Sequence, residues 1–135
     1  MARLEMIKGI NEAYGDVLRE TCAINSVAAL LKVGATPEGC KFLAATLNVP
    51  HTVVLDWLHQ ADLFRVKGIG KEYLALLNAL GIKTLEQLRH QTAEVLCERM
   101  RRINRNHHLV RRLPTLEMVS DWIEQANELT PMAPE

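Results

Sequence analysis

The sequence repeats a two-part pattern, and this repeat limits the possible fold more than any other feature. The stretch IKGINEAY at residues 7–14 matches VKGIGKEY at residues 66–73 without a gap, and LDWLHQAD at residues 55–62 matches SDWIEQAN at residues 120–127. Two blocks that recur in the same order predict two copies of one structural unit. The offsets are 59 and 65 residues, so the later copy carries six additional residues, in or near an arginine-rich segment.

Apolar residues after the glycines recur at helical spacing, and capping residues flank these runs. After the second glycine pair the run ends at Gly81, which is placed to close a helix in a left-handed cap. Thr84 with Gln87 has the pattern of a capping box, and Thr36 and Thr115 are expected N-caps. No segment alternates as a strand does. The sequence therefore predicts an all-α protein of about eight helices, with Trp57 and Trp122 as core anchors.

Length and composition set the domain organisation and exclude several classes of protein. With 135 residues, of which 48% are hydrophobic, the chain can bury one core or two small ones. We predict a first unit over residues 1–63, a second over residues 64–129 and a tail over residues 130–135. No run approaches the ~20 apolar residues of a membrane span, and the N-terminal stretch lacks the pattern of a signal peptide. We expect a cytoplasmic protein without a membrane partner.

The three cysteines do not form a pattern that predicts a disulfide framework or a metal site. They are odd in number and far apart, without a CxxC pair: Cys22, Cys40 and Cys97. Structural zinc sites and disulfide frameworks depend on paired spacings that are absent here. We expect buried free thiols, no metal and no cofactor.

At the second glycine pair the chain resembles a known motif. VKGIGKEYLALLNALGIKTLEQL resembles a helix-hairpin-helix motif, which occurs in DNA repair and replication proteins. The whole chain, including LVRRLPTLEMVSDWIEQA, also resembles a bacterial family of tandem helix-hairpin-helix proteins described only as a domain of unknown function. The resemblance implies two related helix-hairpin-helix units and a hairpin that contacts the nucleic-acid backbone without reading sequence.

The residues of this hairpin suit a phosphate on chemical grounds as well. Glycines at positions 68 and 70 allow positive φ and a close approach of the backbone to a ligand. Free N–H groups at the start of the following helix form an anion site. The candidate site comprises Lys67, Gly68, Ile69, Gly70 and Lys71. The first copy offers Lys8 and Gly9, with Asn11 at the second glycine position, where we expect Asn to tolerate a left-handed conformation.

A second candidate surface lies in CERMRRINRNHHLVRR. Leu96, Met100 and Ile103 form one apolar stripe of a helix. That leaves an outer arginine face of four residues: Arg99, Arg101, Arg102 and Arg105. The candidate phosphate contacts are the last three. Glu98 lies at pairing distance from Arg101 and Arg102. The final helix carries an acidic stripe that could neutralise these arginines within one chain or across a dimer: Glu117, Asp121, Glu124 and Glu128.

Other functional classes find less support in the sequence. Residues 41–61 resemble a helix-turn-helix, but the expected exposed residues, His51, Thr52, Asp56, His59 and Gln60, include an aspartate that phosphates repel, so we interpret this segment as a structural unit. His107 and His108 would point about 100° apart on a helix, and Cys97 has no third partner for catalysis. We predict a non-enzymatic protein that binds DNA or RNA backbone. The alternative is a protein-interaction module or homodimer, which zero net charge favours.

Overall fold

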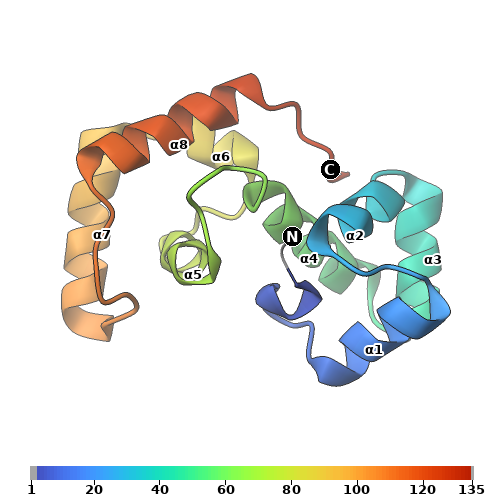
Figure 1. Cartoon of the computed structure of the whole chain (residues 1–135). Coiled ribbons are helices and arrows are strands. Elements are labelled where there is room, and N and C mark those ends of the chain that lie inside the picture. The colour runs from blue at the N-terminus through green and yellow to red at the C-terminus, as the bar shows by residue number, and fades with distance from the viewer. Residues whose placement is uncertain (1–2, 135) are drawn as a thin grey trace. The chain divides into compact units, whose positions relative to one another are not determined.

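The computed structural model of the chain describes residues 3–134. Over these residues it forms eight α-helices, one short 3-10 helix and no strand, which confirms the predicted all-α class (Figure 1). The elements are η1 Leu4–Met6, α1 Glu12–Thr21, α2 Val27–Gly34, α3 Pro37–Leu47, α4 His51–Leu63, α5 Lys71–Ala79, α6 Leu85–Arg89, α7 Ala93–His107 and α8 Leu116–Glu128.

The chain divides into two units, and the first is not continuous in sequence. Unit 1 contains residues 3–62 and 131–134 of the described chain, and unit 2 is Leu63–Thr130. The tail joins unit 1 because the buried Asp62 carboxylate accepts hydrogen bonds from the backbone N–H of Met132 (3.0 Å) and of Ala133 (2.9 Å). We expected the tail as a separate segment from residue 130.

Side-chain caps fix most of the helix starts. In α3, α6 and α8 the threonines expected from the sequence accept a hydrogen bond from the backbone N–H three residues later: Thr36, Thr84 and Thr115. The Gln87 side chain accepts from the N–H of Lys83 at 2.7 Å, so the return bond of the predicted capping box is made one residue before the N-cap Thr84. At the end of α5, Gly81 has a φ of +83°, and Ile82 donates to the carbonyl of Leu77 at 2.9 Å. This is the predicted left-handed helix end.

Each unit buries its own tryptophan in its own core. In unit 2, α8 packs on α6 and α7, and α5 packs on α7. Trp122 is 1% exposed there, among the buried side chains of these helices. In unit 1, Trp57 of α4 is equally buried. Both tryptophans are therefore core residues, as predicted.

Between its turn and its tryptophan helix, unit 2 is longer than unit 1 around the arginine-rich segment. α7 has 15 residues against 11 in α3, and residues 108–115 join α7 to α8, where residues 48–50 join α3 to α4. The short α6 offsets part of this length. Unit 2 therefore has a long arginine-bearing helix and an extended loop for which unit 1 has no equivalent among its described residues.

Candidate nucleic-acid interface

The two glycine turns have the same backbone pattern. In unit 1, Ile7 donates to the carbonyl of Leu4 and Ile10 to that of Ile7, both at 3.1 Å. In unit 2 the matching bonds run from Val66 to Leu63 (3.1 Å) and from Ile69 to Val66 (3.2 Å). The isoleucine of each turn is buried, at 4% and 5% exposure for Ile10 and Ile69. The turns are thus anchored in their cores by an apolar side chain.

The first glycine of each turn is required by a tryptophan. Gly9 and Gly68 have φ values of +103° and +100°. A Cβ on Gly9 would lie 2.7 Å from Nε1 of Trp57, and one on Gly68 would lie 2.9 Å from Nε1 of Trp122. Real Cβ contacts are not that short, so each indole occupies the space that a side chain would need. At these positions glycine serves the core as well as the turn.

The second glycine does not behave as predicted. Gly70 has a φ of −100°, and a Cβ there would meet nothing within 4 Å. The prediction of positive φ is confirmed at Gly68 and wrong at Gly70. Gly70 is the extended residue that precedes α5, and any residue can adopt that conformation.

A glutamine clamps each turn from the tryptophan helix. Gln125 accepts from the N–H of Lys67 at 2.8 Å and donates to the carbonyl of Lys67 at 3.0 Å. Gln60 makes the same pair of bonds with Lys8, at 2.9 and 3.0 Å. These bonds occupy the lysine backbone and leave the side chains exposed. Sequence reasoning missed both glutamines, although each stands three residues after its tryptophan in the repeated block.

The two turns differ in the cap of the helix that follows. In unit 1, Asn11 is extended (φ −84°), and its side chain accepts from the N–H of Tyr14 at 2.8 Å. The expected left-handed conformation of Asn11 is therefore wrong, because the residue is an N-cap. In unit 2, Gly70 has no side chain to cap α5. The first intrahelical bond of α5 is donated by Leu74 to the carbonyl of Gly70, at 2.9 Å, so the amides of residues 71–73 precede the hydrogen-bonded ladder.

An extended loop is fastened beside this helix start. The Asn104 side chain accepts from the N–H of Val110 at 2.9 Å and donates to its carbonyl at 3.1 Å. The hydroxyl of Tyr73, in the first turn of α5, donates to the carbonyl of Arg112 at 3.1 Å. Figure 1 shows the loop returning beside α7 before it enters α8. Exposed Arg111 and Arg112 are thus carried on backbone held against α5.

The arginines of α7 do not form one free face. Arg99, expected on the outer face, is half-buried and donates to the carbonyl of Leu80 at 2.9 Å, so that prediction is wrong. Arg101 and Arg102 both pair with Glu98, as predicted. Arg105 is exposed and has no hydrogen bond or ion pair among residues 3–134. Of the four, Arg105 is the one that remains available in full.

The acidic stripe of α8 is exposed along its length. Its four carboxylates are Glu117, Asp121, Glu124 and Glu128. Asp121 accepts from the Gln125 side chain at 2.8 Å. Within the described part of the chain, no ion pair joins this stripe to the arginines of α7. Within one chain, Glu98 therefore neutralises Arg101 and Arg102, and the carboxylates of the α8 stripe form no ion pair with them.

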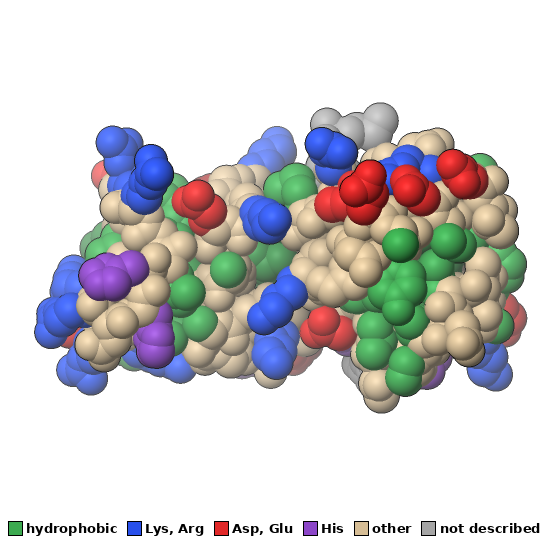
Figure 2. All heavy atoms as spheres, turned by 90° about the horizontal axis from the view of Figure 1, so that it is seen from below, with side chains coloured by type: hydrophobic (Ala, Val, Ile, Leu, Met, Phe, Trp, Pro, Cys, Tyr) green, Lys and Arg blue, Asp and Glu red, His purple; other side chains and the backbone are tan. Residues whose placement is uncertain are grey.

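Zero net charge hides an uneven distribution between the units. Unit 2 has eleven Lys and Arg against eight Asp and Glu, while unit 1 and its tail have five against eight. On the face drawn in Figure 2, Lys, Arg and His side chains gather at the end of unit 2 that carries the C-terminus of α7, whereas a group of Asp and Glu side chains lies on unit 1. The unit with the uncapped turn is the basic one.

The remaining expectations concern recognition, catalysis and membranes. The segment interpreted as a structural unit forms α3 and α4, but Gln60, expected to be exposed, is 3% exposed and clamps Lys8. Burial raises the pKa of the Cys97 thiol. Among residues 3–134, no cluster of three His, Cys, Asp or Glu side chains is arranged to hold a metal ion. In the same range, no helix has the length and apolar character needed to cross a membrane.

Comparison with known proteins gives a family without an assigned activity. Curated proteins and solved structures yielded no match. The sequence profile of a family described as Domain of unknown function (DUF4332) matches residues 8–129. That range contains all eight α-helices, the whole turn of unit 2 and the turn of unit 1 from Lys8 onward. The chain therefore belongs to the DUF4332 family.

Proposed function

We propose that this chain is a non-enzymatic protein of two helix-hairpin-helix units that binds DNA or RNA backbone, without sequence preference, through the turn of unit 2. The observation that carries the proposal is the uncapped start of α5 between two exposed lysines. In unit 1 the Asn11 side chain occupies the corresponding N–H, whereas Gly70 leaves it open. A phosphate oxygen accepts hydrogen bonds from such amides and is favoured by the helix dipole.

The cations around this turn support the same ligand. Lys67 and Lys71 flank the amides, and the loop held by Tyr73 brings Arg111 and Arg112 to the first turn of α5. Glu72 is the opposing charge in this turn. The net of these charges is positive, as phosphate binding requires. Lys8 and Gly9 lack both the open amide and the arginine loop, so we assign them no more than a minor contact.

Salt-dependent binding to a short duplex and a single strand tests the proposal. Lys67→Glu should lower affinity and make the log–log salt slope on duplex DNA shallower by about 0.9 for each phosphate that is no longer neutralised. Lys8→Glu makes the same charge change at the matching position of unit 1 and should have little effect. Glu72→Gln should strengthen binding, since it removes the carboxylate in the first turn of α5. Equal weakening by the two lysine variants, or no binding at about 50 mM salt, would refute the assignment to unit 2.

The exposed stripe of α8 favours a second candidate, an assembly module. Three of its four carboxylates have no hydrogen bond or ion pair among residues 3–134: Glu117, Glu124 and Glu128. A basic surface of a partner, or Arg105 of a second copy, would complement them. Sedimentation at low and at high salt tests this candidate, which predicts an association that weakens as salt rises. A monomer at every salt concentration contradicts self-assembly.

A further inference from the structure

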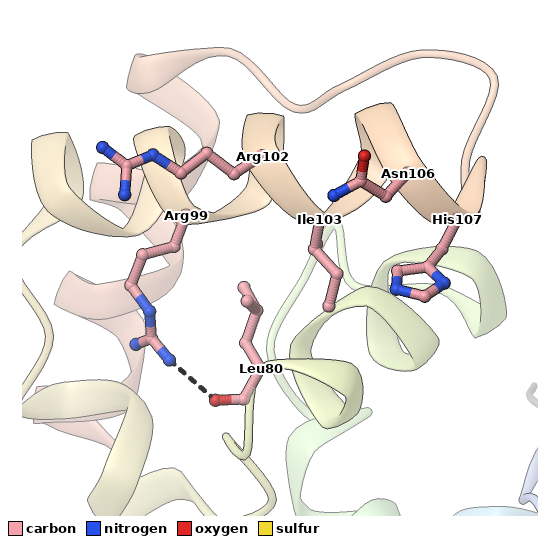
Figure 3. A pocket seen from close by; sticks show the side chains of 6 residues that line it. All are labelled: Leu80, Arg99, Arg102, Ile103, Asn106 and His107. Atoms are coloured by element: carbon pink, nitrogen blue, oxygen red, sulfur yellow. Dashed lines mark hydrogen bonds between the residues drawn. The ribbon is translucent and has the colours of Figure 1, made fainter.

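The end of α5 and one face of α7 enclose a shallow hollow that the turn does not use. Its volume is about 270 Å³, and it is lined by Leu80, Arg99, Arg102, Ile103, Asn106 and His107. In Figure 3, Arg99, Ile103 and His107 extend from the same side of α7, with Leu80 between Arg99 and Ile103 and with His107 beyond Ile103. This volume is just under the ~300 Å³ at which sites for drug-sized ligands begin. It is large enough to receive one heteroaromatic ring.

The charge of the hollow selects against cationic ligands. Two of its six lining residues are arginines, and none is a carboxylate. Glu98, which pairs with Arg102 at 3.4 Å, does not line it. A ligand that carries a negative group therefore gains from Arg102 at the rim, while its apolar part rests on Leu80 and Ile103.

Arg99 shapes the hollow in a more specific way. Its guanidinium donates to the carbonyl of Leu80 at 2.9 Å and to the Gln91 side chain at 3.4 Å. These bonds engage two of its five N–H donors and lie in the plane of the group, which leaves the flat face of Arg99 available for stacking. In Figure 3 the His107 imidazole lies at the other end of the hollow, beyond Ile103; a guanidinium face and an imidazole are each a surface on which a nucleobase stacks.

We propose that the hollow receives one unpaired base of a nucleic-acid strand whose backbone lies on the turn of unit 2. This inference rests on the proposed function and extends it from phosphates to a base. Leu80 and Ile103 form the floor, the His107 imidazole stacks on the base, and Asn106, its neighbour in the chain, offers an amide donor and acceptor to the base edge. The turn and Leu80 lie at opposite ends of α5, whose nine residues span about 14 Å at 1.5 Å each. A few nucleotides of an unpaired strand cover that length.

The test compares two strands of about twelve nucleotides with equal numbers of phosphates, one of thymidines and one of abasic residues. The thymidine strand should bind at least about fivefold more tightly, because one stacked base is worth that much in comparable sites. The double variant Asn106→Ala, His107→Ala should abolish this preference without weakening binding of the abasic strand. Arg105→Ala, also on α7 but outside the hollow, should weaken both strands equally.

The outcomes separate this inference from the function on which it rests. If neither strand binds, the proposed function fails. If both bind equally, or if the preference survives the double variant, only the hollow is misassigned. If that variant loses helicity, NMR of the unmodified protein replaces it as the test. Shifts of the Asn106 side-chain amide signals with the thymidine strand, but not with the abasic strand, support the inference, and their absence overturns it. Full competition by free thymidine monophosphate would make the hollow a nucleotide site and overturn the strand assignment.

Discussion

Replacing Gly68 with alanine should destabilise unit 2, while the same change at Gly70 should not. At Gly68 the backbone has a φ of +100°, and the added Cβ would lie 2.9 Å from Nε1 of Trp122. The indole is rigid and 1% exposed, so it cannot move aside without disturbing the core. At Gly70 the φ is −100° and the space is open. The two glycines belong to one turn and receive the same chemical change.

The magnitude follows from these two effects. Positive φ costs an L-residue about 1–2 kcal/mol, and forcing an extra methyl into a packed core costs about 1–3 kcal/mol. Their sum, about 2–5 kcal/mol, is a large part of the ~5–15 kcal/mol that holds a domain folded. Gly70→Ala should instead be neutral or stabilising by about 0.4–1 kcal/mol, because alanine restricts the unfolded chain.

Urea unfolding followed by far-UV circular dichroism and by tryptophan fluorescence measures both variants. Each unit contains one tryptophan, so fluorescence reports on both, and a separate early transition is expected for Gly68→Ala if the units unfold independently. Gly9→Ala, whose Cβ would lie 2.7 Å from Nε1 of Trp57, should do the same to unit 1. A Gly68→Ala variant within about 0.5 kcal/mol of the parent, or equal destabilisation at Gly68 and Gly70, would refute the reasoning.

Three further predictions concern other contacts. In urea unfolding, Gln60→Ala should lower the free energy of unfolding more than Gln125→Ala. Gln60 is 3% exposed, so its removal leaves the N–H of Lys8 unpaired where water has less access. The reverse order of the two variants contradicts this. The hydrogen bonds from Arg19 lower the pKa of Glu5, so their contribution to stability is present above the ordinary pKa of Glu5 and is lost as pH falls through the lowered value. Arg19→Gln should therefore make the acid unfolding profile less steep below the ordinary pKa of Glu5, and an unchanged pH profile excludes it. Burial raises the pKa of the thiols of Cys22, Cys40 and Cys97, so thiol titration of the folded protein at about pH 7 should lag behind that of the unfolded chain; equal rates count against burial.

Local patterns in the sequence predict the helices well, because spacing and caps act within a few residues. The threonine caps, the left-handed Gly81 and the buried tryptophans all follow from such patterns. The backbone conformation of Gly70 could not be predicted in this way. Glycine is compatible with both positive φ and extended backbone, so its presence cannot tell which one a turn uses.

The candidate site depends on contacts between distant residues, which periodicity does not encode. Arg99 stands three residues after the buried Leu96, at the edge of the apolar stripe, and its long side chain reaches the carbonyl of Leu80. The bond from Tyr73 to Arg112 joins residues 39 positions apart. The longer spacing between the matching sequence blocks is the one sequence signal of this loop, and it gives the place of the additional residues without their partners.

The return of the tail to Asp62 sets an order of events during synthesis. Met132, which donates to Asp62, follows it by 70 residues. At about 5–20 residues per second, the ribosome makes the later residue roughly 4–14 s after the earlier one. In that interval the whole of unit 2 is made while the Asp62 carboxylate still awaits the amides of residues 132 and 133. Residues 132 and 133 come after the last residue of unit 2, so unit 1 can reach its final form only after all of unit 2 has been made, and the earlier part of the chain is not the first to be completed.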